Sequence, residues 1–203
     1  GSRTRQPREP LYPMDTLTHA LSGALVGRVL AARRAVAAGQ PAANAVQVPV
    51  WQMVVAGTAA AIFPDLDFVL GWISELTYLR GHRGVTHSLI LLPLWGVLIA
   101  WLLARFWQRG GRVAAGWRSF YPVVCAAIFV HILGDLITQF GTMILAPFSD
   151  HRFGWGTSFI IDLPFTGILL AGLLASALWR SSRVPATASL VLLAGWVGVQ
   201  ATG

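Results

Sequence analysis

The sequence predicts an all-α protein, a polytopic transmembrane bundle of about five or six membrane helices with a metal site near its non-cytoplasmic face. Hydrophobic residues make up 55% of the 203 residues and charged residues only 11%, whereas soluble domains contain about 25% charged residues. Several apolar runs reach the roughly 20 residues that a helix needs to cross a bilayer. Histidine and aspartate recur near the ends of these runs, where ionisable side chains usually serve a function.

The chain is expected to contain one folded domain. Residues 1–13 are rich in arginine and proline, and we expect a disordered N-terminal extension there. Residues 14–203 are expected to form a single transmembrane helical metal-binding domain. Its first helix is expected over Leu17–Ala38, and a linker rich in alanine, glycine and proline follows over Gly39–Pro49.

A second apolar run, Val50–Phe63, is expected to end at Pro64, because proline cannot donate a backbone hydrogen bond. The acidic stretch Asp65-Leu66-Asp67 follows it directly. The third helix is expected over Leu89–Trp107. The polar stretch 82–88 (HRGVTHS) leads into this helix, and Thr86 is expected to cap its N-terminus.

A fourth helix is expected over Phe120–Phe140, and it carries His131 and Asp135. Residues 141–158 are rich in glycine and aromatic residues and are expected to form a loop. A fifth helix is expected over Phe159–Trp179, and a sixth apolar run extends from Val184 to the end of the chain.

Basic residues gather in the loops after the first, third and fifth predicted helices. Acidic residues are absent from these loops, which indicates that this face is cytoplasmic. The pattern predicts a multi-pass membrane protein whose site faces the non-cytoplasmic side. It also argues against nucleic acid as a partner, although the net charge is +7. The arginines of these loops are Arg28, Arg33, Arg34, Arg105, Arg109, Arg112, Arg118, Arg180 and Arg183.

Alternation of the predicted helices brings histidine and aspartate from four separate segments to the non-cytoplasmic side. His131 and Asp135 are four residues apart and share one helical face. Mixed imidazole and carboxylate ligands favour zinc, with manganese or iron as alternatives, and the number of candidate ligands allows two or even three ions. The predicted metal ligands are His19, Asp65, Asp67, His82, His87, His131 and Asp135.

Each of these residues also has a simpler interpretation. A single His-x-x-x-Asp pair is more often a hydrogen bond between packed helices, and Asp65-Leu66-Asp67 also fits a turn. His151 is expected to be an exposed loop residue. Their joint occurrence favours metal binding over these interpretations.

Six stretches of the chain carry a family resemblance: 14–23 (MDTLTHALSG), 63–67 (FPDLD), 82–88 (HRGVTHS), 131–135 (HILGD), 147–153 (PFSDHRF) and 159–162 (FIID). Together they resemble the bacterial inner-membrane metal-dependent hydrolases of the YdjM type, which implies a location in a bacterial inner membrane. This resemblance implies a hydrolase, a divalent metal held by the matching histidines and aspartates, and Met14 as the usual first residue. The chain departs from the family pattern in two ways. It has Asp162-Leu163-Pro164 where the family pattern has Asp-Pro-Leu. Relatives also often continue past Gly203, so a truncation at the C-terminus is expected.

The sequence therefore predicts a metal-dependent hydrolase that cleaves a phosphoester or another ester bond through a metal-activated water. A site at the bilayer edge favours a lipid or lipid-linked substrate. Asp67 or Asp162 is the expected general base, and Arg83 is expected to bind the anionic group of the substrate. The alternatives are a transporter for a divalent cation and a membrane subunit with a purely structural metal. The oligomeric state is left open.

Overall fold

The computed structural model describes residues 14–37, 48–110, 115–138, 140–156, 163–179, 182 and 184–202. Within these ranges the chain forms seven α-helices and three 3₁₀ segments. The β-structure in the described residues is one isolated bridge, between Thr142 and Phe153. The all-α prediction is confirmed. The predicted extension over residues 1–13 lies outside the described residues.

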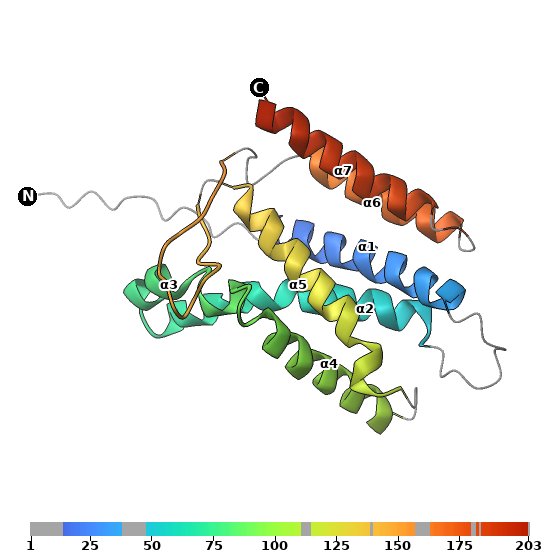
Figure 1. Ribbon diagram of the computed structural model, residues 1–203, viewed down its shortest axis with the longest axis horizontal. Helices are drawn as coiled ribbons and strands as arrows, with labels where there is room; N and C mark the ends of the chain where they lie inside the picture. Colours follow the sequence, from blue (N-terminus) through green and yellow to red (C-terminus); the bar gives the residue numbers. More distant parts are fainter. Residues whose placement is uncertain are drawn as a thin grey trace, which may run out of the picture.

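Two closely packed helices, α1 (Met14–Ala37) and α2 (Val50–Ile62), lie side by side at the centre of the bundle (Figure 1). A Cβ atom added at Gly27 would overlap the carbonyl of Met53, and one added at Gly57 would overlap the carbonyl of Gly23. Small residues at such crossings let two helix backbones touch, which is the usual way in which membrane helices associate. The α1–α2 pair is the central unit on which other helices pack.

The other long helices are arranged around this pair. Helix α5 (Tyr121–Leu136) packs on both α1 and α2, and α4 (Leu92–Arg109) packs on α5. Helices α6 (Leu163–Leu178) and α7 (Val184–Thr202) pair with each other and lie on the other side of α1 (Figure 1). The main core lies between α1, α2, α4 and α5, and a smaller apolar cluster joins α1 to α6 and α7.

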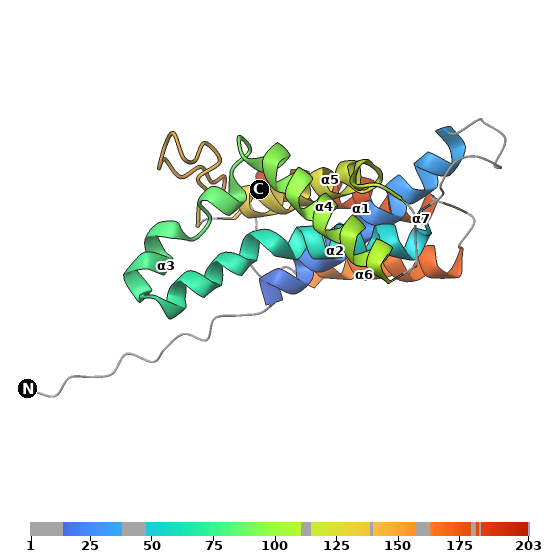
Figure 2. The same ribbon diagram turned by 90° about the horizontal axis from the view of Figure 1, so that it is seen from below.

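Helix α2 ends at Ile62, close to the predicted end of the second helical run at Phe63. The chain continues as a 3₁₀ helix, η1 (Phe63–Trp72), in which Pro64 occupies the first turn. Proline is tolerated there because the backbone N–H that it lacks has no partner within the helix. Helix α3 (Glu75–Gly81), which the sequence analysis did not predict, then returns beside η1, and the two extend from one end of the bundle (Figure 2).

Two further helix boundaries differ from the predicted ones. Helix α4 begins at Leu92, and Thr86 does not cap it, because Thr86 lies in the short 3₁₀ segment η2 (Val85–His87). The hydroxyl of Ser88 accepts hydrogen bonds from the backbone N–H groups of Ile90 and Leu91 instead. Helix α5 ends at Leu136, earlier than predicted.

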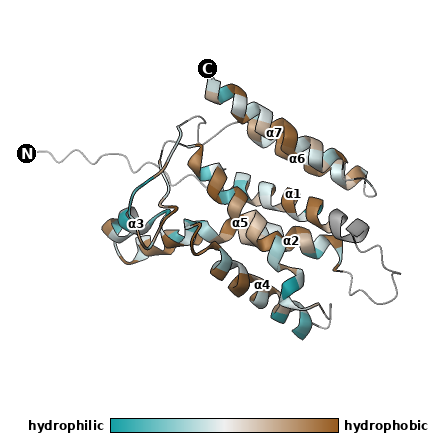
Figure 3. Cartoon of the chain, viewed as in Figure 1, coloured by the Kyte–Doolittle hydropathy of each residue, from teal (hydrophilic) through white to brown (hydrophobic). Residues whose placement is uncertain are grey.

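Two helical stretches in the described residues are long and apolar enough to cross a membrane. They are the α2–η1 rod, Val50–Trp72, with 23 residues, and α7, with 19 residues. Helices α5 and α6 are apolar but shorter. Hydrophilic residues lie mainly around α3 and at the far end of α4 (Figure 3). The prediction of five or six membrane helices, and of their orientation, stays a prediction.

Candidate metal centre

Four segments that are far apart in the sequence bring their histidines and aspartates to one place between α1, η1, η2 and α5. His87, His131 and Asp135 are completely buried, and His19 is 4% exposed. The prediction that these segments converge is therefore confirmed. The residues that meet are His19 from α1, Asp65 and Asp67 from η1, His82, Arg83 and His87 from the segment after α3, and His131 and Asp135 from α5.

The centre of the cluster is formed by His87, His131 and Asp135. Nε2 of His87 lies 3.0 Å from Nε2 of His131. Oδ2 of Asp135 lies 3.0 Å from the first of these nitrogens and 3.4 Å from the second. Oδ1 of Asp65 lies 3.6 Å from Nε2 of His131. Three side chains therefore direct one polar atom each toward a common point, with Asp65 at its edge.

The orientation of the His131 ring is set by the end of α2. Nδ1 of His131 lies 2.6 Å from the backbone carbonyl oxygen of Ala61. A carbonyl oxygen can only accept, so Nδ1 is the donor, and the neutral imidazole then carries its lone pair on Nε2. A second-layer hydrogen bond of this kind is typical of histidines that bind metals. The role of Ala61 could not be predicted from the sequence, because backbone carbonyls leave no signal in side-chain patterns.

His87 is oriented by a short chain of hydrogen bonds. Its Nδ1 lies 3.0 Å from the hydroxyl oxygen of Thr86, which in turn donates to Oδ2 of Asp67 at 3.5 Å. Because the Thr86 proton points toward Asp67, Nδ1 of His87 donates to Thr86. This arrangement leaves the lone pair on Nε2 of His87. When both imidazoles are neutral, both Nε2 atoms of the central pair are acceptors.

His19 completes the cluster from α1. Its ring stacks on His131 with 3.8 Å between ring centroids, and its Nε2 lies 3.3 Å from Oδ1 of Asp135. Gly134 makes room for this ring, because a Cβ atom there would lie 2.9 Å from Cε1 of His19. This glycine precedes Asp135 in the motif 131–135, and its role was not predicted from the sequence.

Two overlapping groups of side chains have the spacing of metal ligands, with candidate ligand atoms within 4.8 Å of one another. One group is His19, His131 and Asp135, and the other is Asp65, His87 and His131. Both groups include His131, whose Nδ1 already bonds to Ala61, so both depend on the same Nε2. The two groups therefore describe one centre rather than two separate ones.

Asp67 and His82, which were predicted as metal ligands, lie in a layer behind this centre. Oδ1 of Asp67 is 2.9 Å from Nδ1 of His82, and Oδ2 accepts a hydrogen bond of 2.8 Å from the backbone N–H of Arg83. Oδ2 also lies 3.7 Å from Nδ1 of His87. Asp67 thus orders the segment from His82 to His87.

Arg83 is 4% exposed and has a positive φ of 56°. Its Nη2 lies 2.8 Å from Oδ1 of Asp135, and its Nη1 donates to the hydroxyl of Thr138 at 2.9 Å. The guanidinium group, which was expected to bind a substrate anion, therefore holds Asp135 in this structure. Thr138 was not identified in the sequence analysis, because it lies beyond the metal-ligand pattern.

One side of the cluster is open to its surroundings. The side chain of His82 is 17% exposed and that of Asp65 is 16% exposed. Tyr78 stacks on His82 with 4.6 Å between ring centroids, and burial together with the charge of Asp67 raises the pKa of Tyr78. Arg152, from the loop 140–156, donates to the carbonyl of His82 at 3.1 Å. The exposed edge of the cluster is therefore formed by His82 and Asp65.

Three further polar residues are Asp162, His151 and Ser88. Asp162, the second candidate for general base, lies outside the described residues. His151 is exposed, as expected, and its ring meets that of Phe153 edge to face. Ser88 donates to the backbone carbonyl of Ala146, which gives it a structural contact in the loop.

Neutral imidazole nitrogens and carboxylate oxygens are the ligands that zinc, manganese and iron accept in proteins. The described residues fit such an ion, because two imidazole lone pairs and one carboxylate oxygen face the same point. Their second-layer partners, the Ala61 carbonyl and the Thr86–Asp67 pair, are also present.

Comparison with known proteins gives a family and two named relatives. A family model described as "YdjM inner membrane protein" matches residues 14–203. "Uncharacterized protein YfhP" of Bacillus subtilis (strain 168) is 30% identical over 185 residues, which are 91% of this chain and 52% of that protein. "Inner membrane protein YbcI" of Escherichia coli (strain K12) is 33% identical over 109 residues, 50% of this chain and 57% of that protein. The chain thus spans about half the length of these relatives. No solved structure matches it.

Proposed function

This chain belongs to the YdjM inner membrane protein family, and we propose that it is a metal-dependent hydrolase. In this proposal the buried cluster of histidine and aspartate holds one divalent cation, zinc in the first place. The enzyme then cleaves a phosphoester or another ester bond of a lipid or lipid-linked substrate.

The observation that carries the metal proposal is the 3.0 Å distance between the two Nε2 atoms of His87 and His131. Both nitrogens carry lone pairs when Ala61 and Thr86 accept from the Nδ1 atoms. Oδ2 of Asp135, a third electron-rich atom, lies within 3.4 Å of both. Such atoms repel one another in a buried site of low dielectric constant. His87, His131 and Asp135 would hold a divalent cation here, and its binding would relieve this repulsion.

The charges of the cluster support a single divalent ion. Asp65, Asp67 and Asp135 contribute three negative charges and Arg83 one positive charge, so the net charge with neutral histidines is −2. One divalent cation neutralises this charge. A second ion would leave an excess of positive charge in a buried site, which is costly.

A divalent cation at this centre supplies Lewis acidity and lowers the pKa of a bound water. Asp65 is the described carboxylate that reaches both the centre and the surface. We assign it the role of general base, which accepts the proton of the attacking water and returns it to the leaving oxygen. Asp67 is less suited to this role, because its oxygens accept from His82 and from the backbone of Arg83.

The outer face of η1 supports a lipid-borne substrate. Asp67 is buried in η1, whereas Leu66, Val69 and Trp72 are 48%, 40% and 79% exposed. These three residues are spaced by three, so they form one stripe along a 3₁₀ helix. The apolar surface is therefore separated from the cluster by a single helix. A lipid lying against η1 would bring its head group close to the open side of the cluster.

Purified protein loaded with zinc or manganese is tested on a panel of phospholipids and lipid-linked phosphoesters. The wild type is expected to release a product from at least one member of the panel. His87→Ala and Asp65→Asn are expected to abolish release, whereas His151→Ala, which alters the exposed loop histidine, keeps the activity. Metal binding without hydrolysis, together with cation uptake into proteoliposomes, would show that the protein is a transporter rather than an enzyme. Metal that only raises the unfolding temperature would indicate a structural ion.

A further inference from the structure

The far end of α4 carries a groove that the metal cluster does not use. This groove has a volume of about 830 Å³, and its lining includes Trp101, Leu102, Arg105, Phe106, Trp107 and Arg109. Its apolar walls are exposed, with Trp101 at 48%, Leu102 at 51% and Phe106 at 69%. From its volume, the groove is large enough for part of a lipid or another small molecule.

The lining residues follow one face of the helix. Leu102, Arg105, Phe106 and Arg109 are spaced by three and four residues, which places them next to one another along α4. The exposed apolar residues Leu94, Val97 and Leu98 continue this face toward the start of the helix. Trp107 is only 3% exposed and packs on Phe120 with 4.9 Å between ring centroids. The groove therefore has a firm aromatic floor, with the two arginines at the C-terminal end of the apolar face.

The charged residues that line the groove are both positive. Arg105 and Arg109 are both exposed, and acidic residues are absent from its described lining. In the described part of the chain, neither guanidinium group forms a hydrogen bond or an ion pair. Guanidinium groups bind phosphate oxygens in a planar, two-pronged geometry. An apolar stripe that ends at two arginines matches an acyl chain that ends at a phosphate.

We propose that this face of α4 binds an anionic phospholipid, with its acyl chain along the stripe from Leu94 to Phe106 and its phosphate at Arg105 and Arg109. Basic pockets of membrane proteins that bind anionic head groups combine the same features. Helix α4 has 18 residues, and at about 1.5 Å per residue the two ends are about 26 Å apart. The groove is thus separate from the metal cluster, and the proposal does not depend on the hydrolase function.

The test is native mass spectrometry of the full chain in detergent, titrated with phosphatidylglycerol, and with phosphatidylcholine for comparison. Each arginine near a membrane surface contributes about 1 kcal/mol to the binding of anionic lipid, which corresponds to about fivefold in affinity. Arg105→Gln and Arg109→Gln are each expected to weaken phosphatidylglycerol binding about fivefold, and the double variant about 25-fold. Phe106→Ala weakens it through the loss of the apolar wall.

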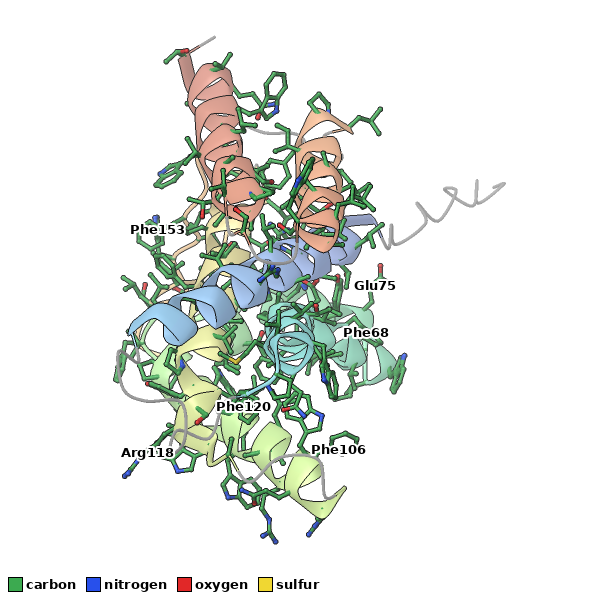
Figure 4. All side chains as sticks on the ribbon, turned by 90° about the vertical axis from the view of Figure 1, so that its right-hand side faces the viewer. Phe68, Glu75, Phe106, Arg118, Phe120 and Phe153 are labelled. Atoms are coloured by element: carbon green, nitrogen blue, oxygen red, sulfur yellow. The ribbon has the colours of Figure 1, made fainter. Side chains whose placement is uncertain are left out.

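Arg118→Gln is the matched control. Arg118 is also an exposed arginine, but it lies over the ring of Trp117 in η3 (Trp117–Ser119). Figure 4 shows it on the opposite side of the bundle's lower end from Phe106. This variant is expected to bind phosphatidylglycerol like the wild type.

Three results would overturn the proposal. The first is equal affinity of wild type and the double variant for phosphatidylglycerol. The second is displacement of the lipid by glycerol phosphate alone at similar concentration, since the acyl chain then contributes nothing. The third is an efficient disulfide between two copies of Trp101→Cys in a lipid membrane, because the groove is then covered by a second copy of this chain.

Discussion

Nε2 of His87 lies 3.0 Å from Nε2 of His131, although the two residues are 44 positions apart in the chain. Each of these rings uses its other nitrogen, Nδ1, in a hydrogen bond that fixes its orientation, to Ala61 in one case and Thr86 in the other. The pair is therefore held in place by the end of α2 and by η2, and its coordinating atoms are directed to a single point.

The first prediction concerns the number of metal ions. Wild-type protein reloaded with zinc is expected to hold about one ion per chain, measured by inductively coupled plasma mass spectrometry, because both candidate ligand groups share Nε2 of His131. His131→Ala should lose the ion. His151→Ala, which removes an exposed histidine of the loop, is the control. Two ions per chain would contradict the single centre, and none after reloading would remove the site altogether.

The second prediction concerns Asp67, which lies behind the centre and contacts it at Nδ1 of His87. Asp67→Asn keeps the shape of the side chain but removes the charge that orients His82 and His87. Loss of such a second-layer partner typically weakens metal binding by about 10–100-fold. The affinity is measured by competition with a chromophoric chelator. Asp150→Asn, at an exposed position, should change nothing. An unaltered affinity in Asp67→Asn would show that Asp67 has no part in ordering the ligands.

The third prediction concerns the pair of Arg83 and Asp135. Arg83→Ala leaves the buried carboxylate of Asp135 without its guanidinium partner, and breaking a buried ion pair in this way costs about 3–5 kcal/mol. Both residues at position 83 have a Cβ, so the positive φ of 56° affects them alike. The metal-free protein should unfold at a lower temperature, which is measured by differential scanning fluorimetry in detergent.

Two further variants identify the cause of this effect. Arg83→Ala combined with Asp135→Asn should regain part of the lost stability, because the unpaired charge is then absent. Arg80→Ala changes an exposed arginine on α3 and should leave the unfolding temperature unchanged. If Arg83→Ala unfolds at the temperature of the wild type, the ion pair makes no net contribution.

The fourth prediction concerns Gly134. A Cβ atom at this position would lie 2.9 Å from Cε1 of His19, so Gly134→Ala should displace the His19 ring. The expected result is weaker metal binding, measured with the same chelator competition. Gly167→Ala is the control, since nothing lies within 4 Å of a Cβ atom there. Wild-type metal affinity in Gly134→Ala would indicate that His19 contributes little to the centre.

Much of the fold follows from local patterns in the sequence. The apolar runs that were predicted as helices correspond to α1, α2, α4, α5, α6 and α7, with shifts at their ends. The shifts arise where local signals compete. At Pro64 the α-helix gives way to a 3₁₀ helix. Just before α4, the hydroxyl of Ser88 rather than that of Thr86 accepts hydrogen bonds from backbone N–H groups.

The residues that meet at the site could be predicted from the sequence, but which of them lie at the centre and which lie behind it could not. His19, His87, His131 and Asp135 could be proposed from residue type, spacing and alternation, and they do meet. The positions of Asp67 and His82 behind the centre could not, because helix type and the turn after α3 set them. Three other contacts could not be predicted from residue spacing either. They are the room that Gly134 leaves for His19, the hydroxyl of Thr138 that binds Arg83, and the backbone carbonyl of Ala61 that binds His131.

The sequence by itself determined the all-α class, the apolar helices and the residue types of the metal cluster, because these depend on composition and on the period of a helix. Only the tertiary structure decided that Arg83 faces Asp135 and that His87 and His131 share one centre. The physical reason is that such contacts join residues tens of positions apart, and their geometry depends on how α1, α2 and α5 pack. That packing in turn rests on the close approach of the helix backbones at Gly23, Gly27 and Gly57.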